Sequence, residues 1–167
     1  MNSANSALIW DGNWAWSLPV VVFNVLFHVI GLGLIRHGLI GTVQAVTTLR
    51  KFDPRFALVM GLTTLMATLL HAMEAGIWAG LFWALGAIPD GRSAMLYSLN
   101  AITSYGHSNL QLAAHWQLMG AVEALNGMLL FGLTTAFLYG VLRRAWATDG
   151  ALVATGRVTA ASFELEV

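Results

Sequence analysis

A short run of small and polar residues lies between two long apolar segments, and it offers the groups in this chain best suited to chemistry. Residues 98–109 read Ser-Leu-Asn-Ala-Ile-Thr-Ser-Tyr-Gly-His-Ser-Asn. The part from Thr103 to Asn109 has poor helix propensity. Non-helical backbone at membrane depth is stable only where it is buried in protein or lines an aqueous path. The run therefore predicts an irregular segment with one of these two roles.

Two glutamates stand inside the apolar segments. His71 and Glu74 are three residues apart and so share one helix face. A glutamate inside a membrane span is costly and indicates a function by default. The pair either forms a hydrogen bond that packs its helix against a neighbour or takes part in proton sensing or permeation. Glu123 either braces the back of the polar run or lies near an ion path and attracts cations.

Two histidines occur in the first apolar segment. His28 and His37 are nine residues apart, which places them on opposite faces of a helix. A haem or metal held by this helix alone is therefore not expected. His28 could ligate haem across helices together with His71, although the chain has no cysteine and hence no CxxCH motif. This would be a redox helical bundle.

The composition indicates a membrane protein. The chain has 167 residues, of which 57% are hydrophobic and 10% are charged. A soluble domain usually carries about 25% charged residues. Eight basic residues balance eight acidic ones, which argues against a nucleic-acid partner. Without cysteine, disulfides and thiolate metal sites are excluded.

Three apolar segments are long enough to cross a bilayer, which takes about 20 residues as a helix. They cover residues 18–40, 56–85 and 116–142, and predict an all-α membrane protein with three transmembrane helices. The prolines stand at the borders of these spans, where proline is tolerated: Pro19, Pro54 and Pro89. We expect the first span to be retained, because no basic residue precedes it as in a signal peptide.

The basic residues predict the orientation. They cluster around the first loop and after the third span: Arg36, Arg50, Lys51, Arg55, Arg143, Arg144 and Arg157. By the positive-inside rule, residues 1–17 lie outside, while the loop 41–55 and the tail 145–167 are cytoplasmic. Tryptophans near the span ends, such as Trp78 and Trp83, fit the aromatic belts at the membrane interfaces.

The polar run and the third span together carry a resemblance. Laid without a gap on the pattern S-x-x-x-x-T-T-V-G-Y-G-D, Ser98, Thr103 and Gly106 match. Asn109-Leu110 precedes Trp116 at a spacing similar to that between a filter acid and an inner-helix Trp. Gly127, Phe131-Gly132-Leu133 and Thr135-Ala136 are similar to the run G-x-x-x-F-G-L-x-T-A. Residues 56–144 thus resemble the two-helix pore module of the tetrameric potassium-channel superfamily.

The resemblance implies a homotetramer in a bacterial inner membrane, with a pore on its fourfold axis. It implies an outer helix at 56–85, a re-entrant pore helix at 93–103, a filter at 104–109 and an inner helix at 116–142. The span 18–40 is an extra helix that packs outside this module or against a neighbouring subunit. Backbone carbonyls of the filter would hold K⁺ or Na⁺, and the four residues concerned are Ser104, Tyr105, Gly106 and His107.

The same resemblance assigns roles to individual residues. The selectivity filter would comprise Thr103, Ser104, Tyr105, Gly106, His107, Ser108 and Asn109. Residues expected to support the filter are Asn100, Tyr97 and Glu123. Residues expected to line the cavity or form the gate are Gly127, Met128, Phe131, Thr135 and Tyr139, with Gly127 as the bending point.

The sequence departs from the family at the filter. His107 stands in place of a tyrosine and Ser108 in place of the second glycine, which predicts an altered ion preference. Asn100 and Asn109 replace a pair of carboxyl groups and could hydrogen bond as amides. We expect a channel for monovalent cations, potassium-type or non-selective, with no enzymatic activity and no cofactor. A non-conducting sensor or scaffold and the haem bundle are the alternatives.

Overall fold

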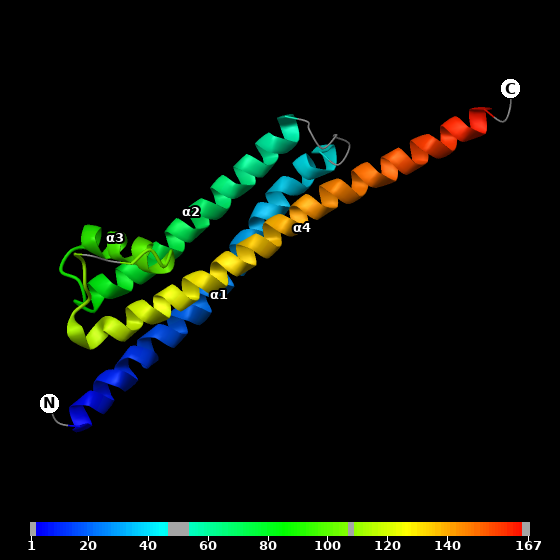
Figure 1. The fold of residues 1–167 in the computed structure, drawn as a ribbon. Coiled ribbons are helices and arrows are strands. Elements are labelled where there is room, and N and C mark those ends of the chain that lie inside the picture. Colours follow the sequence, from blue (N-terminus) through cyan, green and yellow to red (C-terminus); the bar gives the residue numbers. More distant parts are fainter. Residues whose placement is uncertain (1–2, 47–53, 107–108, 165–167) are drawn as a thin grey trace. The chain divides into compact units, whose positions relative to one another are not determined.

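The chain is built from helices. The computed structural model describes residues 3–46, 54–106 and 109–164, and within them the side chains of 10–38, 54, 56–106 and 109–143. The elements are α1 (Ser3–Val46), α2 (Pro54–Ala84), α3 (Gly91–Ile102), the 3₁₀ turn η1 (Ala114–Trp116) and α4 (Gln117–Glu164) (Figure 1). No strand occurs in these ranges, so the all-α prediction is confirmed.

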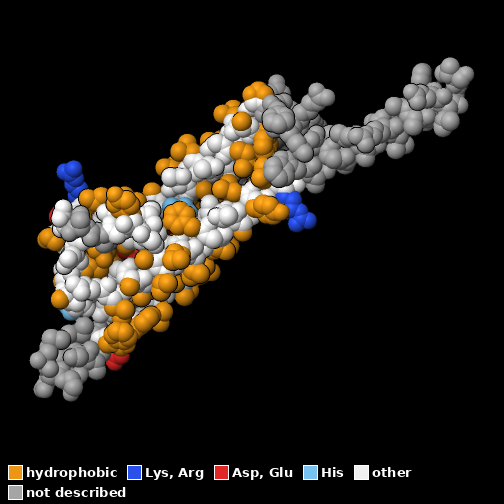
Figure 2. Space-filling view, viewed as in Figure 1, with side chains coloured by type: hydrophobic (Ala, Val, Ile, Leu, Met, Phe, Trp, Pro, Cys, Tyr) orange, Lys and Arg blue, Asp and Glu red, His pale blue; other side chains and the backbone are white. Residues whose placement is uncertain are grey.

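Three helices are long and apolar enough to cross a membrane. The candidate spans are Trp10–Gly38, Phe56–Ala84 and Ala114–Arg143. Hydrophobic side chains cover the visible face of the described helices, as Figure 2 shows. The chain is therefore a multi-pass membrane protein, as its composition predicts.

The first helix begins earlier than the sequence predicts. α1 starts at Ser3 instead of residue 18, so Pro19 lies inside a helix and its placement at a span border was wrong. The reason is long-range contact. Asn13 Nδ2 donates a hydrogen bond of 2.7 Å to the carbonyl of His115, and Trp14 packs on the hydrophobic core. These contacts hold the extra turns in place.

The helix α1 is mostly polar on its buried face and apolar on its exposed face. On α1 the buried face carries Asn13, Ser17, Asn24 and His28, whose spacing places them on one side of the helix. The opposite face exposes large apolar residues such as Phe23 and Ile30. This inversion of the usual pattern is stable only where the outer face meets lipid.

Internal contacts divide the chain into two units, and each of the three long helices contributes to both. The first unit comprises Met1–Gly31 and Thr68–Thr134, and the second comprises Leu32–Ala67 and Thr135–Val167. The core of the first unit is formed by buried residues of α2, α3 and α4 and by the segments beside them, among them Trp78, Phe82, Ala94, Tyr97 and Met119. Trp78 is fully buried in this core, whereas Trp83, which is also expected near a membrane interface, is exposed.

The short helix α3 has a defined cap at each end. The side chain of Asp90 accepts a 2.9 Å hydrogen bond from the backbone N–H of Ser93. This bond holds the pKa of Asp90 below its ordinary value. At the other end, the Thr103 hydroxyl donates 2.7 Å to the carbonyl of Leu99. Both caps satisfy backbone groups that a helix end leaves without intrahelical partners.

Asp90→Ala is expected to lower the melting temperature of the purified protein, whereas Asp90→Asn keeps most of the stability because an amide oxygen also caps. The lowered pKa gives the sign of the pH dependence. The stabilisation by the Asp90 carboxylate is present above its ordinary pKa of 3.8 and is lost as the pH falls through the lowered value. Thermal unfolding is followed by circular dichroism from about pH 7 to about pH 3. The melting temperature of wild type should approach that of Asp90→Ala as the pH falls. Equal stability of all three proteins at neutral pH would contradict the cap.

Candidate functional site

Two glycines on α4 form the surface on which α3 packs. Gly120 and Gly127 are seven residues apart and share one face of the helix. A Cβ at Gly120 would overlap the hydroxyl of Tyr97, and a Cβ at Gly127 would overlap the backbone carbonyl of Ile102. On its other side Tyr97 meets Phe82 of α2 edge to face, with ring centroids 5.5 Å apart. The helix α3 is thus held against both α2 and α4 (Figure 1).

The contact at Gly127 locates the end of α3 along the third span. Gly127 follows Ala114 by 13 residues, or about 20 Å of helix, and therefore lies near the middle of the span Ala114–Arg143. The 12 residues of α3 cover about 18 Å. At the start of the span, the N–H of Ala113 donates 3.1 Å to the carbonyl of Ala87. The segment between α2 and α4 thus has both its ends, Ala87 and Ala113, near the start of α4. Its middle reaches further along α4, because Ile102 lies beside Gly127.

The residues after α3 leave the helix with unusual backbone angles. Ser104 has a φ of 55° and Gly106 a φ of 87°, in the left-handed region. Glycine adopts this region freely, as the resemblance implies for Gly106, but serine does so at a cost. The N–H groups of Ser104 and Tyr105 donate to the carbonyls of Ala101 and Asn100 at 2.8 and 3.0 Å. The first half of the predicted filter is therefore tied to the end of α3.

The predicted filter is exposed in a single chain where the structure describes it. Thr103, Ser104, Tyr105 and Gly106 are exposed, with 84% of Tyr105 accessible. Asn109 is exposed as well, and His107 and Ser108 lie outside the described residues. This part of the chain is therefore little covered by the rest of the chain that the structure describes.

The residues predicted to support the filter are in different environments. Tyr97 is buried, and Glu123 is fully buried beside Ser98 of α3, without a hydrogen bond of standard geometry between them. Glu123 thus lies on the face of α4 that meets α3. Asn100 is half-buried and Asn109 is exposed, and among the described contacts no hydrogen bond joins their side chains.

The residues predicted to line a cavity are mostly exposed on α4. Met128 is 64% accessible, Tyr139 is 60% accessible, and Thr135 is exposed. The ring of Phe131 stacks on His71 with centroids 4.3 Å apart, so one face of this ring is covered. Gly127 is buried against Ile102, which gives it a packing contact besides the bending role that the resemblance implies.

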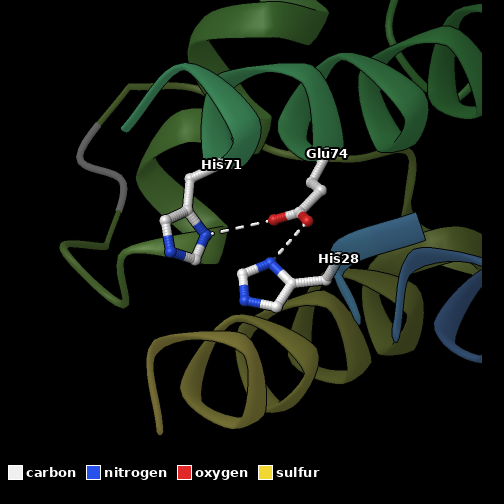
Figure 3. A group of neighbouring side chains, drawn as sticks. All are labelled: His28, His71 and Glu74. Carbon is white, nitrogen blue, oxygen red and sulfur yellow. Dashed lines mark hydrogen bonds and ion pairs between the residues drawn. The ribbon is translucent and has the colours of Figure 1, made fainter. Parts of the chain in front are cut away.

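A second group of polar residues lies buried in the first unit. Glu74 Oε1 is 2.7 Å from His28 Nδ1, and Glu74 Oε2 is 3.1 Å from His71 Nδ1 (Figure 3). The hydroxyl oxygen of Thr134 is 3.1 Å from His28 Nε2 and 3.0 Å from His71 Nε2. All four residues are buried. The expected pair of His71 and Glu74 is present, and it is part of a ring that joins α1, α2 and α4.

Sequence reasoning missed two members of this ring. In the sequence, His28 is a candidate only for haem ligation, and nothing singles out Thr134. The signal for His28 was its position in the middle of an apolar span. The imidazole centroids of His28 and His71 are 5.1 Å apart, and Glu74 and Thr134 bridge the two rings on both sides. All four ring nitrogens thus face Glu74 or Thr134, an arrangement that differs from the axial ligation of a haem.

No protein-family model, curated protein or solved structure matches this chain. The loop after α3, the buried ring and the motifs of the polar run and the third span are therefore the features that bear on function.

Gly120→Ala is expected to destabilise the protein by about 1–3 kcal/mol, because the new methyl group displaces the Tyr97 hydroxyl from a packed core. Tyr97→Phe removes the overlapping oxygen atom. The double variant should therefore be more stable than the sum of the two single effects predicts, by about 0.5–3 kcal/mol. Thermal unfolding of wild type, the two single variants and the double variant in detergent measures this coupling. If the two changes in stability simply added up in the double variant, the contact between Gly120 and Tyr97 would be contradicted.

Proposed function

We propose that this chain is the subunit of a channel for monovalent cations, built on the plan of the potassium-channel pore module. The observation that carries the proposal is the contact between Ile102 and Gly127. It supports a re-entrant segment, because α3 would run from the outer end of the third span to its middle, and the chain would return from there. Irregular backbone at that depth requires an aqueous path or a protein environment.

The end of α3 suits a cation. A helix carries about half a negative charge at its C-terminus, from carbonyl groups without intrahelical partners. In the proposed tetramer, four such ends would point to a common axis. Beyond them, the carbonyls of Ser104, Tyr105, Gly106 and His107 would replace the water around K⁺ or Na⁺. The left-handed φ of Gly106 is the kind of backbone angle by which carbonyl groups of successive residues turn to one side.

The exposure of the filter and of α4 supports assembly into a homotetramer. One chain offers a single loop, whereas a filter of this type is a ring of loops. Tyr105, Met128 and Tyr139 are exposed in the single chain, as expected for residues that meet the axis or a neighbouring subunit. The first span would pack as an extra helix outside the pore. We place the protein in the bacterial plasma membrane, with the N-terminus outside and the C-terminus in the cytoplasm.

Cation flux in liposomes tests the proposal. Purified protein should conduct K⁺, Na⁺ or Li⁺ down a gradient, and comparison of the three ions gives the preference. Gly106→Ala should reduce flux strongly, because alanine at a φ of 87° is strained, while the exposed loop leaves the fold intact. Gly80→Ala on α2 is the control, since Gly80 is exposed, lies outside the proposed pore lining, and no atom lies within 4 Å of the added methyl group. Absence of flux at every pH and voltage tried would overturn conduction and favour a sensor or scaffold.

The ion preference tests the filter alignment itself. The double variant His107→Tyr, Ser108→Gly restores the family's residues at both positions and should shift the preference toward K⁺. An unchanged ratio of K⁺ to Na⁺ flux would show that these residues do not form the filter. The K⁺ to Na⁺ ratio is best measured in the same vesicles, so that differences in reconstitution cancel.

A further inference from the structure

The ring of buried polar residues has two ligand atoms that lack a hydrogen bond of standard geometry. His71 Nδ1 and Glu74 Oε2 are 3.1 Å apart, at an ion-pair distance, but neither atom has a hydrogen-bond partner of standard geometry. Both atoms are buried. A buried polar atom without a partner costs about 1–3 kcal/mol, and more when it is charged. Together with His28 Nδ1, these atoms form a cluster of ligand atoms of the kind that can hold a cation.

Thr134 fixes the outer nitrogens of both imidazoles. Its hydroxyl oxygen lies 3.1 Å from His28 Nε2 and 3.0 Å from His71 Nε2. A hydroxyl oxygen has two lone pairs, so it can accept an N–H from each ring. With a metal bound, this tautomer leaves both Nδ1 lone pairs available to the ion, whereas without a metal His28 Nδ1 donates its N–H to the Glu74 carboxylate. Metal-binding histidines characteristically donate their other N–H to a neighbouring polar group in this way.

We propose that His28, His71 and Glu74 bind one divalent transition-metal ion of the zinc class per chain. One ligand atom from each residue lies within 4.8 Å of the other two. Ligands of a tetrahedral zinc ion are about 3.3 Å apart, given bonds of about 2.0–2.1 Å. Two imidazoles and a carboxylate are typical zinc ligands, whereas Ca²⁺ and Mg²⁺ favour all-oxygen sites. The proposal does not depend on ion conduction.

The charge of the site supports the ion. Glu74 is fully buried within a candidate span, where an unpaired carboxylate is costly. A divalent ion offsets this charge and leaves one positive charge, which a hydroxide in the fourth position would neutralise. The ion would take the place of protons between the carboxylate and the two Nδ1 atoms.

The site would join the first helix to the second. His28 belongs to α1, and His71 and Glu74 belong to α2, as Figure 3 shows. One turn beyond His28, a Cβ at Gly31 would meet the side chain of Leu70 at 2.6 Å, so the two helices approach closely here. A metal at this position would fasten the extra N-terminal helix to the rest of the first unit.

Metal content of the full chain tests the proposal. Protein in detergent, with its purification tag removed, is equilibrated with Zn²⁺ or Co²⁺ and freed of unbound ion, and the bound metal is then measured by mass spectrometry. We expect about one ion per chain in wild type and less than about one tenth of that in His28→Gln and Glu74→Gln. His115→Gln and His37→Gln change exposed histidines and should bind as wild type does.

Glu74→Gln separates metal binding from folding. An amide can accept from His28 Nδ1 and donate to His71 Nδ1, so the ring keeps its hydrogen bonds while it loses the negative charge. Wild-type protein with Co²⁺ gives a readout that needs no variant, because a tetrahedral site produces intense visible absorption. Absence of this absorption together with no retained zinc in wild type would overturn the proposal, as would undiminished binding in His28→Gln.

Discussion

Replacing Gly127 with alanine is expected to abolish cation flux and to destabilise the protein by about 1–3 kcal/mol or more. The added methyl group would overlap the backbone carbonyl of Ile102, and a backbone atom cannot rotate away as a side chain can. The end of α3 must then move away from α4. In the proposed channel this movement displaces the filter, because Ser104 and Tyr105 are hydrogen-bonded to the last turn of α3.

Gly132→Ala is the matched control for this variant. It makes the same chemical change five residues later on the same helix, where nothing lies within 4 Å of the new methyl group. Alanine within a helix is more stable than glycine by about 0.5–1 kcal/mol, so this variant should be at least as stable as wild type. Thermal unfolding and liposome flux are measured on both. A Gly127→Ala protein of wild-type stability with altered flux would mean that Gly127 acts as the bending point and not as a contact.

Local sequence signals predicted the bounds of α2 and α3 well, but not the start of α1. α2 (Pro54–Ala84) and α3 (Gly91–Ile102) lie within two residues of the predicted bounds. Proline at a first turn is a local feature, which a sequence displays directly. The start of α1 could not be predicted in this way, because it depends on a hydrogen bond between Asn13 and His115, 102 residues apart.

The packed face of an apolar helix was also beyond prediction. When every face is apolar, periodicity does not show which one packs on protein and which one meets lipid. Trp78, for example, is buried in the core, which its position towards the end of an apolar span does not indicate. The polar residues were the better guide, because Asn24 and His28 mark the inward face of α1.

The candidate sites also have a local part, which the sequence shows, and a part that depends on packing between helices. The polar run after α3 is visible in the sequence, and Gly106 was expected to adopt its positive φ. The positive φ of Ser104 was not expected, because serine rarely adopts it. The ring around Glu74 requires the register between three helices, which depends on packing. The sequence could give only its local part, the pair of His71 and Glu74.

The second large effect is expected at Glu74. Glu74→Ala should destabilise the protein by about 3–5 kcal/mol, because it removes one partner of a buried pair and leaves two imidazoles facing an empty space. Glu74→Gln should cost much less, since its amide bonds to both rings. Both are compared with wild type in the presence of a chelator, so that no bound metal contributes to stability.

Met73→Ala is the control for Glu74→Ala. Met73 is the neighbouring residue on α2 and is exposed, so its truncation removes few contacts and should change stability by about 0.5 kcal/mol or less. Thermal unfolding in detergent should give the highest melting temperatures for wild type and Met73→Ala. The melting temperature of Glu74→Gln should be lower, and that of Glu74→Ala the lowest. If Glu74→Ala unfolded at the same temperature as Met73→Ala, the carboxylate would not hold the two histidines. The ring would then contribute nothing to the packing of α1 on α2.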